Sequence, residues 1–265
     1  MEMKDKTVVL TGAAGGIGAA IALLFAQQGA QLILVSRNPD KLEALNNELP
    51  GGRHIRVVAD LSAPEGRQHL LEACGGGVDI LVNNAGVNHF GLLQSQSESQ
   101  IREMFELNAI VPVLLTRALL PQMRKSGFTI VNVGSGFGSI GFAGYCGYSA
   151  SKFALRGFTE ALRRELAGST VKVLYLAPRA TETSMNSPAV VAMNKELGNA
   201  MDSPHWVAAE LLKLLNKSTG SRYLGWPERF FIKLNGLFPS IVDKALAGQL
   251  PVIRRQAMAH EREGS

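Results

Sequence analysis

Four glycines stand within the eight residues 11–18, TGAAGGIG, directly after the apolar run Thr7–Leu10. Glycine loses more backbone freedom on folding than any other residue, so a cluster of glycines destabilises an ordered element. Such a cluster is useful where the chain must turn tightly, or where a ligand must lie closer to the main chain than a Cβ atom allows. The stretch therefore predicts a strand, a tight turn and a helix, with a ligand seated against the turn.

Apolar runs and helical patterns alternate along the rest of the chain. The predicted strands are Thr7–Leu10, Gln31–Val35, Ile55–Ala59, Ile80–Val82, Thr129–Val133, Val171–Leu176 and a short one near Arg222–Leu224. The predicted helices are Ile17–Gln28, Pro39–Leu49, Gln68–Cys74, Ser99–Lys125, Ser149–Leu166 and Trp206–Leu215, and residues 179–206 are expected to be irregular. Nearly continuous apolar strands separated by helices are typical of a parallel sheet covered on both faces. The predicted fold class is α/β, a Rossmann-type doubly wound parallel β-sheet in a single domain.

Charge and cysteine content exclude several classes of protein. The net charge is +5, but no stretch combines Lys and Arg with interleaved aromatic residues as a nucleic-acid-binding face does. Cys74 and Cys146 lie far apart without metal-ligand spacing, so we expect no disulfide scaffold, no metal site and a cytoplasmic protein. We read the N-terminal residues as a first strand rather than a signal peptide. No uninterrupted apolar stretch approaches the roughly 20 residues that span a bilayer.

The glycine-rich turn has the features of a phosphate-binding site. In a parallel sheet, ligands bind beyond the carboxyl ends of the strands, where the first strand turns into the first helix. Glycines at positions 12, 16 and 18 let the chain turn, let a pyrophosphate reach the backbone and let the helix pack on the strand. The helix N-terminus adds free N–H groups and a positive dipole end. The stretch predicts a dinucleotide site, and a plain glycine-rich turn is the alternative.

The end of the second predicted strand discriminates between two dinucleotides. An NAD site tends to carry Asp or Glu about 20 residues after the glycines, where it binds the ribose 2′-hydroxyl. Ser36 and Arg37 stand there instead. A guanidinium binds a 2′-phosphate through its planar fork, and the absence of a carboxylate removes repulsion. The pair predicts NADP(H), and an ordinary surface arginine is the alternative.

Two later motifs make the prediction more specific. Residues 83–86 (NNAG) follow the fourth strand, and residues 148–152 (YSASK) open a helix, with Tyr148 thirteen residues after Ser135. Together with TGAAGGIG, in this order, the motifs resemble those of the short-chain dehydrogenase/reductase family. The resemblance covers about residues 6–183 and, more loosely, extends to 224. It implies an oxidoreductase that forms homo-oligomers, dimers or tetramers, through the long helices around Asn108 and Tyr148.

The spacing of the second motif explains its chemistry. Tyr148 and Lys152 lie four residues apart, so their side chains share one face of a helix. A neighbouring ammonium group favours the phenolate and lowers the pKa of a tyrosine toward working pH, where proton transfer is efficient. We therefore expect Tyr148 to protonate a carbonyl oxygen and Ser135 to hydrogen-bond the same oxygen. The resemblance implies that Lys152 also binds the nicotinamide ribose and that Asn108 holds a water linking Lys152 to solvent. A solvent-facing or capping role is the alternative for Asn108.

The predicted site has a catalytic part and a coenzyme-binding part. The catalytic residues are Asn108, Ser135, Tyr148 and Lys152. The coenzyme-binding residues are Gly12, Ala14, Gly15, Gly16, Ile17, Gly18, Ser36, Arg37, Asp60, Leu61, Asn84, Ala85, Gly86, Tyr148, Lys152, Pro178, Thr181 and Thr183. Asp60 and Leu61 match the family position that contacts the adenine, and a helix cap is the alternative for Asp60.

The chain departs from the family pattern after the sixth strand. The family usually has Pro-Gly there, then an apolar residue and a Thr, whereas this chain has PRATET at 178–183. Arg179 replaces the glycine, and Thr181 replaces the apolar residue whose backbone meets the nicotinamide amide. We expect Arg179 to be a solvent-exposed loop residue, and contact with a substrate anion is the alternative.

Residues 227–265 follow the dinucleotide-binding and catalytic domain, which we assign to residues 1–226. Apolar residues recur in this extension at helical spacing, with an interruption at Pro239 and with basic residues at the flanks: Phe230, Phe231, Leu234, Leu237 and Phe238. We expect the extension to pack on its own domain or a twin subunit, to form a lid over an apolar substrate, or to lie on a membrane surface as a peripheral contact.

These observations predict an NADP(H)-dependent carbonyl reductase that converts a hydrophobic ketone or 3-oxoacyl-like group into a secondary alcohol. Phe137 and Phe142, which precede Tyr148, favour the hydrophobic substrate. One alternative is an NAD-dependent alcohol dehydrogenase on the same fold. Another is a sensor or scaffold that binds NADP without turnover, which has no use for the intact set of Ser135, Tyr148 and Lys152.

Overall fold

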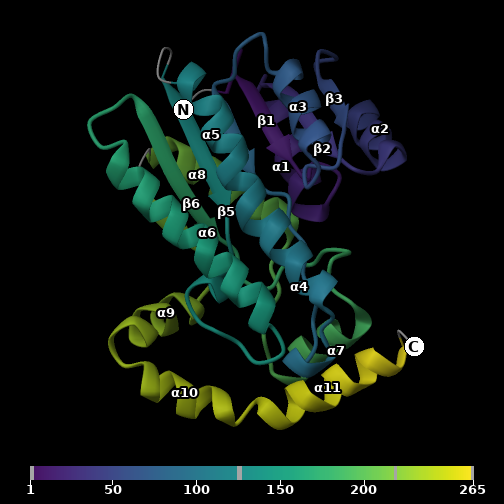
Figure 1. The fold of residues 1–265 in the computed structure, drawn as a ribbon, viewed down its shortest axis with the longest axis vertical. Helices are drawn as coiled ribbons and strands as arrows, with labels where there is room; N and C mark the ends of the chain where they lie inside the picture. Colours follow the sequence, from purple (N-terminus) through teal and green to yellow (C-terminus); the bar gives the residue numbers. More distant parts are fainter. Residues whose placement is uncertain (1–2, 124–126, 218–219, 264–265) are drawn as a thin grey trace.

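A computed structural model describes residues 3–123, 127–217 and 220–263. In this part of the chain, seven strands form one parallel sheet in the order β3-β2-β1-β4-β5-β6-β7 (Figure 1). The strands are β1 (Thr7–Thr11), β2 (Gln31–Ser36), β3 (Ile55–Val58), β4 (Ile80–Asn83), β5 (Phe128–Val133), β6 (Val171–Ala177) and β7 (Gly220–Tyr223). The chain winds outward from β1 in one direction and from β4 in the other. The predicted doubly wound α/β fold is confirmed.

Helices cover both faces of the sheet. Within β1, Val8 and Leu10 belong to the core on one face, with α1 (Gly16–Gln27), α2 (Pro39–Glu48) and α8 (Pro204–Lys217). Val9 belongs to the core on the other face, with α3 (Pro64–Ala73), α5 (Val111–Met123) and α6 (Cys146–Glu165). This two-residue alternation is expected of a strand buried on both sides. Because all the strand pairs are parallel, the carboxyl ends of the strands lie along one edge of the sheet, where the loops that follow them gather.

The predicted helix Ser99–Lys125 is a helical run whose geometry changes in the middle. It begins as α4 (Glu98–Phe105) and passes through a π-helical segment, η2 (Glu106–Ile110), into α5; predicted residues 124–125 lie outside the described part. Single π turns inside helices often mark functional positions, and this one contains Asn108. By length and composition the run Glu98–Pro121 could cross a bilayer, in contrast to the prediction that no apolar stretch is long enough. Half of its most apolar window is nevertheless buried inside the domain, as expected of a core helix.

The segment 179–206 is not irregular throughout, which corrects the prediction. It contains α7 (Pro188–Glu196), whose first turn carries Pro188 and whose N-cap is Ser187, with Oγ accepting a hydrogen bond from the Val190 N–H at 3.4 Å. A serine cap followed by proline is a recognised signal for a helix start. The short helix went unnoticed because its apolar residues show little amphipathic pattern.

The C-terminal extension forms three helices. These are α9 (Glu228–Leu237), α10 (Pro239–Ala247), which begins at the proline that interrupts the sequence pattern, and α11 (Leu250–Glu263). They cross one end of the molecule below the sheet, and α11 packs along α7 (Figure 1). The loops after β5 and β6 therefore lie between the sheet and these last helices.

Candidate active site

Two cavities meet at the carboxyl edge of the sheet. The first, which we call the glycine groove, has a volume of about 620 Å³ and runs from the glycine turn and Arg37 to Tyr148 and Lys152. The second, which we call the outer cavity, has a volume of about 590 Å³ and lies between the Ser135 loop and the helices α7, α9 and α10. Tyr148 lines both cavities. Its side chain is therefore placed to act between a molecule in the groove and a molecule in the outer cavity.

The structure brings the predicted site residues together at these cavities. The predicted coenzyme-binding residues line the glycine groove, except Pro178 and Thr181, which line the outer cavity. Among the predicted catalytic residues, Tyr148 and Lys152 line the groove and Ser135 lines the outer cavity. Asn108 is fully buried behind them.

The glycine turn has a shape that side chains would destroy. Gly12 has a φ of +65°, and a Cβ atom there would lie 2.8 Å from the Ala85 Cα; a Cβ atom on Gly18 would collide with the Gly12 carbonyl oxygen. The Asn84 side chain braces the turn by donating hydrogen bonds to the carbonyl oxygens of Thr11 at 3.0 Å and Gly12 at 3.2 Å. Gly15 caps α1, and because it has no side chain the N–H groups of the first turn keep their capacity to bind an anion.

The far end of the groove carries the Ser36-Arg37 pair. The Arg37 guanidinium lies 3.5 Å from the Glu103 carboxylate, and its side chain remains 55% exposed. Exposed ion pairs of this kind contribute about 0–1 kcal/mol, so the guanidinium can exchange this partner for a stronger anion. Asp60 lines the groove and also accepts a hydrogen bond from the Ser62 N–H at 2.9 Å. The N-cap of α3 is Ala63, so the helix-cap alternative for Asp60 is wrong.

Tyr148, Ser135 and Lys152 form a compact cluster where the two cavities meet. Ser135 hydrogen-bonds the Tyr148 hydroxyl. Lys152 Nζ donates to the Val133 carbonyl oxygen at 3.2 Å and lies 5.7 Å from the centroid of the Tyr148 ring. The spacing of four residues on α6 thus places phenol and ammonium on one face, as predicted.

Asn108 is neither solvent-facing nor a helix cap, so that alternative is wrong. Its side-chain oxygen accepts from the Val87 N–H at 2.8 Å, and its amide nitrogen donates to the Val87 carbonyl oxygen at 2.9 Å and to Ser151 Oγ at 3.0 Å. These bonds hold the loop after β4 against α6. The water-holding role of Asn108 stays a prediction.

Burial sets the protonation of the central pair. It raises the pKa of Tyr148, and the hydrogen bond with Ser135 lowers it by less. The expected lowering of the tyrosine pKa by Lys152 is therefore wrong for this structure, because desolvation of the phenolate is the larger effect. Burial also lowers the pKa of Lys152 to about 8. At neutral pH the structure holds a protonated phenol beside an ammonium group that is close to losing its proton.

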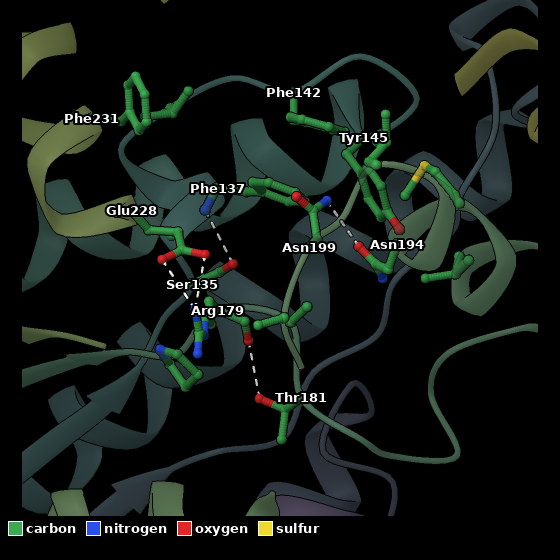
Figure 2. Close-up of a pocket in the computed structure, with 18 of the residues that line it drawn as sticks. Ser135, Phe137, Phe142, Tyr145, Arg179, Thr181, Asn194, Asn199, Glu228 and Phe231 are labelled. Atoms are coloured by element: carbon green, nitrogen blue, oxygen red, sulfur yellow. Dashed lines mark hydrogen bonds and ion pairs between the residues drawn. The ribbon is translucent and has the colours of Figure 1, made fainter. Parts of the chain in front are cut away.

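The outer cavity is mainly apolar. Phe137 and Phe142 stack with ring centroids 4.8 Å apart, and Tyr145 packs against Phe137 at 5.0 Å. Figure 2 shows these rings on one side of the cavity and Phe231 of α9 on another, with Ser135 and Arg179 between them. The extension supplies further apolar lining through Ile232, Val242 and Leu246.

Arg179 is a partly buried, ion-paired residue rather than a solvent-exposed loop residue, which corrects the prediction. Its side chain is 17% exposed and binds both oxygens of Asp202, at 2.8 and 3.0 Å, and the Glu228 carboxylate of α9 at 3.3 Å (Figure 2). It therefore joins the loop after β6 to the first helix of the extension. Thr181 lies beside it, with its hydroxyl donating to the Arg179 carbonyl oxygen and its own carbonyl accepting from Asn186.

Sequence reasoning missed polar residues of the outer cavity. Asn88 hydrogen-bonds Tyr145, and among the described residues its side-chain oxygen and that of Gln249 are buried without a partner. Asn88 follows β4 at the carboxyl edge of the sheet, a position from which ligand contacts could have been anticipated. Gln249 carried no such signal, because its place depends on how the extension folds.

Comparison with known proteins identifies the family. A family model described as short chain dehydrogenase matches residues 6–193. The chain belongs to the short-chain dehydrogenase family. Carbonyl reductase family member 4 of Danio rerio is 35% identical to this short-chain dehydrogenase over 186 residues, which cover 69% of this chain and 78% of the relative.

Two solved structures share the fold with this short-chain dehydrogenase. A short-chain dehydrogenase from Burkholderia cenocepacia J2315 in complex with NADP aligns with a TM-score of 0.80 at 22% identity, over 93% of this chain and 99% of that chain. The 3-ketoacyl-(acyl-carrier-protein) reductase from Brucella melitensis complexed with NADH aligns with a TM-score of 0.76 at 26% identity, over 83% and 96% of the two chains. This short-chain dehydrogenase is therefore an NAD(P)-dependent oxidoreductase acting on CH–OH and C=O groups.

Proposed function

We propose that the protein uses NADPH to reduce an apolar ketone or 3-oxoacyl group to a secondary alcohol. The observation that carries the proposal is the position of Tyr148, whose side chain lines both the glycine groove and the outer cavity, next to Ser135. Coenzyme in the groove and a carbonyl in the outer cavity would meet at this side chain.

The residues of the groove fit a dinucleotide. The turn at Gly12 leaves the backbone open to a pyrophosphate, and the Gly15-capped start of α1 offers N–H donors to it. When bound, the nicotinamide coenzyme supplies a hydride to the carbonyl carbon. Lys152 lies at the inner end of the groove, where its ammonium group can bind the ribose hydroxyls.

Tyr148 supplies the proton that completes the reduction. Its raised pKa keeps the phenol protonated at neutral pH, which is the form that a general acid needs. The hydroxyl proton passes to the carbonyl oxygen, and Ser135 hydrogen-bonds the same oxygen. The phenolate that remains is stabilised by the Lys152 ammonium group, so the product is an alcohol and the charge stays beside a cation.

The preference for NADPH rests on the far end of the groove. Ser36, Arg37 and Lys41 line it, and two cations there favour a 2′-phosphate. Glu103, which pairs with Arg37 and lines the same groove, is the observation that favours the alternative, an NAD-dependent alcohol dehydrogenase. Titration with NADPH and NADH separates the two, because tighter NADH binding contradicts the NADPH preference.

We further propose a cytoplasmic homo-oligomer. Cys74 and Cys146 are free thiols, which agrees with a reducing compartment. Ile110 and Phe153 expose large apolar side chains at η2 and α6, the helices around Asn108 and Tyr148. Sedimentation velocity measures the subunit number directly.

Replacement of the phenol tests the proposed reaction. The Tyr148→Phe variant should bind NADPH normally but lose about 10²- to 10⁴-fold in turnover, because proton transfer by a positioned side chain contributes a factor of this size. The measurement is NADPH oxidation in a screen of ketones and acyl thioesters, with coenzyme binding followed by fluorescence. Tight NADPH binding without turnover by the wild type for every carbonyl would instead indicate a sensor or scaffold.

A further inference from the structure

The outward side of α9 and α10 is apolar and rich in aromatic rings. Six large exposed side chains lie on these helices or, for Trp226 and Phe238, directly before them, and range from 37% exposed for Phe231 to 73% for Leu237: Trp226, Phe230, Phe231, Leu237, Phe238 and Ile241. We call this set the apolar face. Single exposed apolar residues are ordinary, but a group of them on one surface is typical of a site that binds a membrane or another molecule.

The apolar face is not needed to attach α9 to the domain. Glu228, Ile232 and Asn235 lie one turn apart on the inward side: Glu228 pairs with Arg179, Ile232 lines the outer cavity, and Asn235 donates to the Ser139 carbonyl oxygen at 3.0 Å. Phe230 and Leu237 are seven residues apart and share the opposite side. The helix is thus docked through one side while the other presents apolar rings outward.

The charges beside the apolar face are mainly basic. Arg229, Lys233 and Lys244 are exposed on α9 and α10. These two described helices contain two acidic residues, Glu228, which forms an ion pair with Arg179, and the exposed Asp243. Aromatic residues with a basic rim are typical of helices that lie in the interface of an anionic membrane. Two copies of this face would bring like charges together, which disfavours self-association.

The apolar face is continuous with the lining of the outer cavity. Trp226 and Phe231 belong to both, since each is exposed and each also lines the cavity (Figure 2 for Phe231). An apolar molecule dissolved in a bilayer under this face would have a path into the cavity that passes along apolar side chains.

We propose that the apolar face docks on the surface of a bilayer containing anionic lipid, and that an apolar carbonyl substrate enters the outer cavity from that bilayer. The docking is supported by the set of exposed apolar side chains and the basic residues beside them. The entry of substrate rests on the proposed function.

Flotation of the full-length protein with vesicles tests the docking. The wild type should float with phosphatidylcholine vesicles that contain phosphatidylserine, and less with phosphatidylcholine alone. Arg229→Gln with Lys233→Gln should weaken binding to the anionic vesicles by about 25-fold, since each basic residue near the surface contributes about fivefold. Phe230→Gln with Leu237→Gln should abolish flotation on both kinds of vesicle.

The controls separate docking from folding and from catalysis. Val58→Gln with Arg53→Gln changes one exposed apolar and one exposed basic residue near β3 and should float as the wild type does. None of the replaced residues lines either cavity, so all variants should reduce a short water-soluble ketone equally. An apolar ketone delivered in anionic vesicles should be reduced faster by the wild type than by the two α9 variants.

The docking proposal is overturned if the wild type does not float or if either α9 variant floats as the wild type does. If no form floats and the wild type is a dimer that Phe230→Gln with Leu237→Gln dissociates in sedimentation, the apolar face is an interface between two copies of the chain. Flotation as expected without turnover of any carbonyl supports the docking and overturns the proposed function. Equal reduction of the vesicle-borne ketone by all forms overturns entry from the bilayer.

Discussion

Tyr148 and Lys152 owe their protonation states to burial more than to each other. The spacing of four residues correctly predicted that both side chains share one face of α6. The ammonium nitrogen, however, donates to the Val133 carbonyl oxygen and lies over the tyrosine ring, while Lys152 is buried and Tyr148 is partly buried. Each neutral form is therefore favoured, with the tyrosine pKa raised and the lysine pKa lowered. The spacing in the sequence therefore predicts that the two groups meet, whereas their pKa values depend on how far the fold removes each group from water.

The lowered pKa of Lys152 predicts a pH dependence of stability. Burial lowers this pKa from 10.5 to about 8, so between these values the unfolded chain binds more of the proton and the free energy of unfolding rises with pH. Below about pH 8 both states are protonated and the full penalty, about 3 kcal/mol, is present. Lys152→Met should remove this dependence. Below pH 8 the Lys152→Met variant lacks the cost of burying an ammonium group, so its free energy of unfolding should exceed that of the wild type. This difference should shrink by up to about 3 kcal/mol from pH 8 to 10.5.

Urea denaturation of both proteins without coenzyme, at a series of pH values, measures this difference. The buried Tyr145 and Tyr175 are present in both proteins, so their titration cancels in the comparison. Parallel stability curves for the two proteins would show that Lys152 is not desolvated in the way its surroundings indicate.

At the scale of elements, Arg179 links the loop after β6 to α9. Its partners Asp202 and Glu228 stand 23 and 49 residues further along the chain. The substitution of Arg for the usual Gly was visible in the sequence, but its partners were not. An arginine with two carboxylates and little exposure holds the wall of the outer cavity in place, whereas a free loop arginine would leave α9 attached by apolar contacts and the hydrogen bond of Asn235.

A double-mutant cycle on Arg179→Ala and Glu228→Gln tests this link. We expect a coupling free energy of about 1 kcal/mol or more, because the pair is largely shielded from water. Both variants should raise KM for large apolar ketones by several fold with a smaller change in kcat. The matched control is the Glu98–Arg102 pair of α4, in which both side chains are 78% exposed, and its coupling should not exceed about 0.5 kcal/mol. Equal coupling in the two cycles would contradict this link.

The difference between local patterns and contacts of distant segments explains how much of the fold and the site the sequence could predict. The strands, the glycine turn and the Tyr148–Lys152 pair were predictable because each depends on local periodicity or spacing. The π-helical turn at Asn108 was not, because it forms where the helical run packs against α6. The helix α7 carried a start signal at Ser187 and Pro188 but no clear amphipathic pattern, and its place depends on packing against α11. The residues that line the outer cavity come from segments far apart in the chain, so Asn194, Gln249 and Tyr145 line one cavity only in the folded molecule.

At the scale of the whole molecule, the extension shares a core with the site. Phe90 and Tyr145 from the loops of the sheet, Met193 from α7, and Ile253 and Ala257 from α11 form one buried cluster. The last helix therefore rests on the walls of the outer cavity, and its loss would expose the rings that shape that cavity. A tail built in this way should unfold together with the sheet.

Ile253→Ala tests whether the protein unfolds as one body. Ile253 is buried, so its truncation should lower the free energy of unfolding by about 2–5 kcal/mol and shift a single cooperative transition to lower denaturant. Met258→Ala on the same helix removes a half-exposed side chain and should change stability by no more than about 0.5 kcal/mol. Circular dichroism and tryptophan fluorescence follow the transition in parallel, with Trp226 reporting near α9 and Trp206 within α8. If Ile253→Ala moved the fluorescence of Trp226 alone while the helical signal kept its wild-type midpoint, the extension would be an independent unit, and the walls of the outer cavity would form without it.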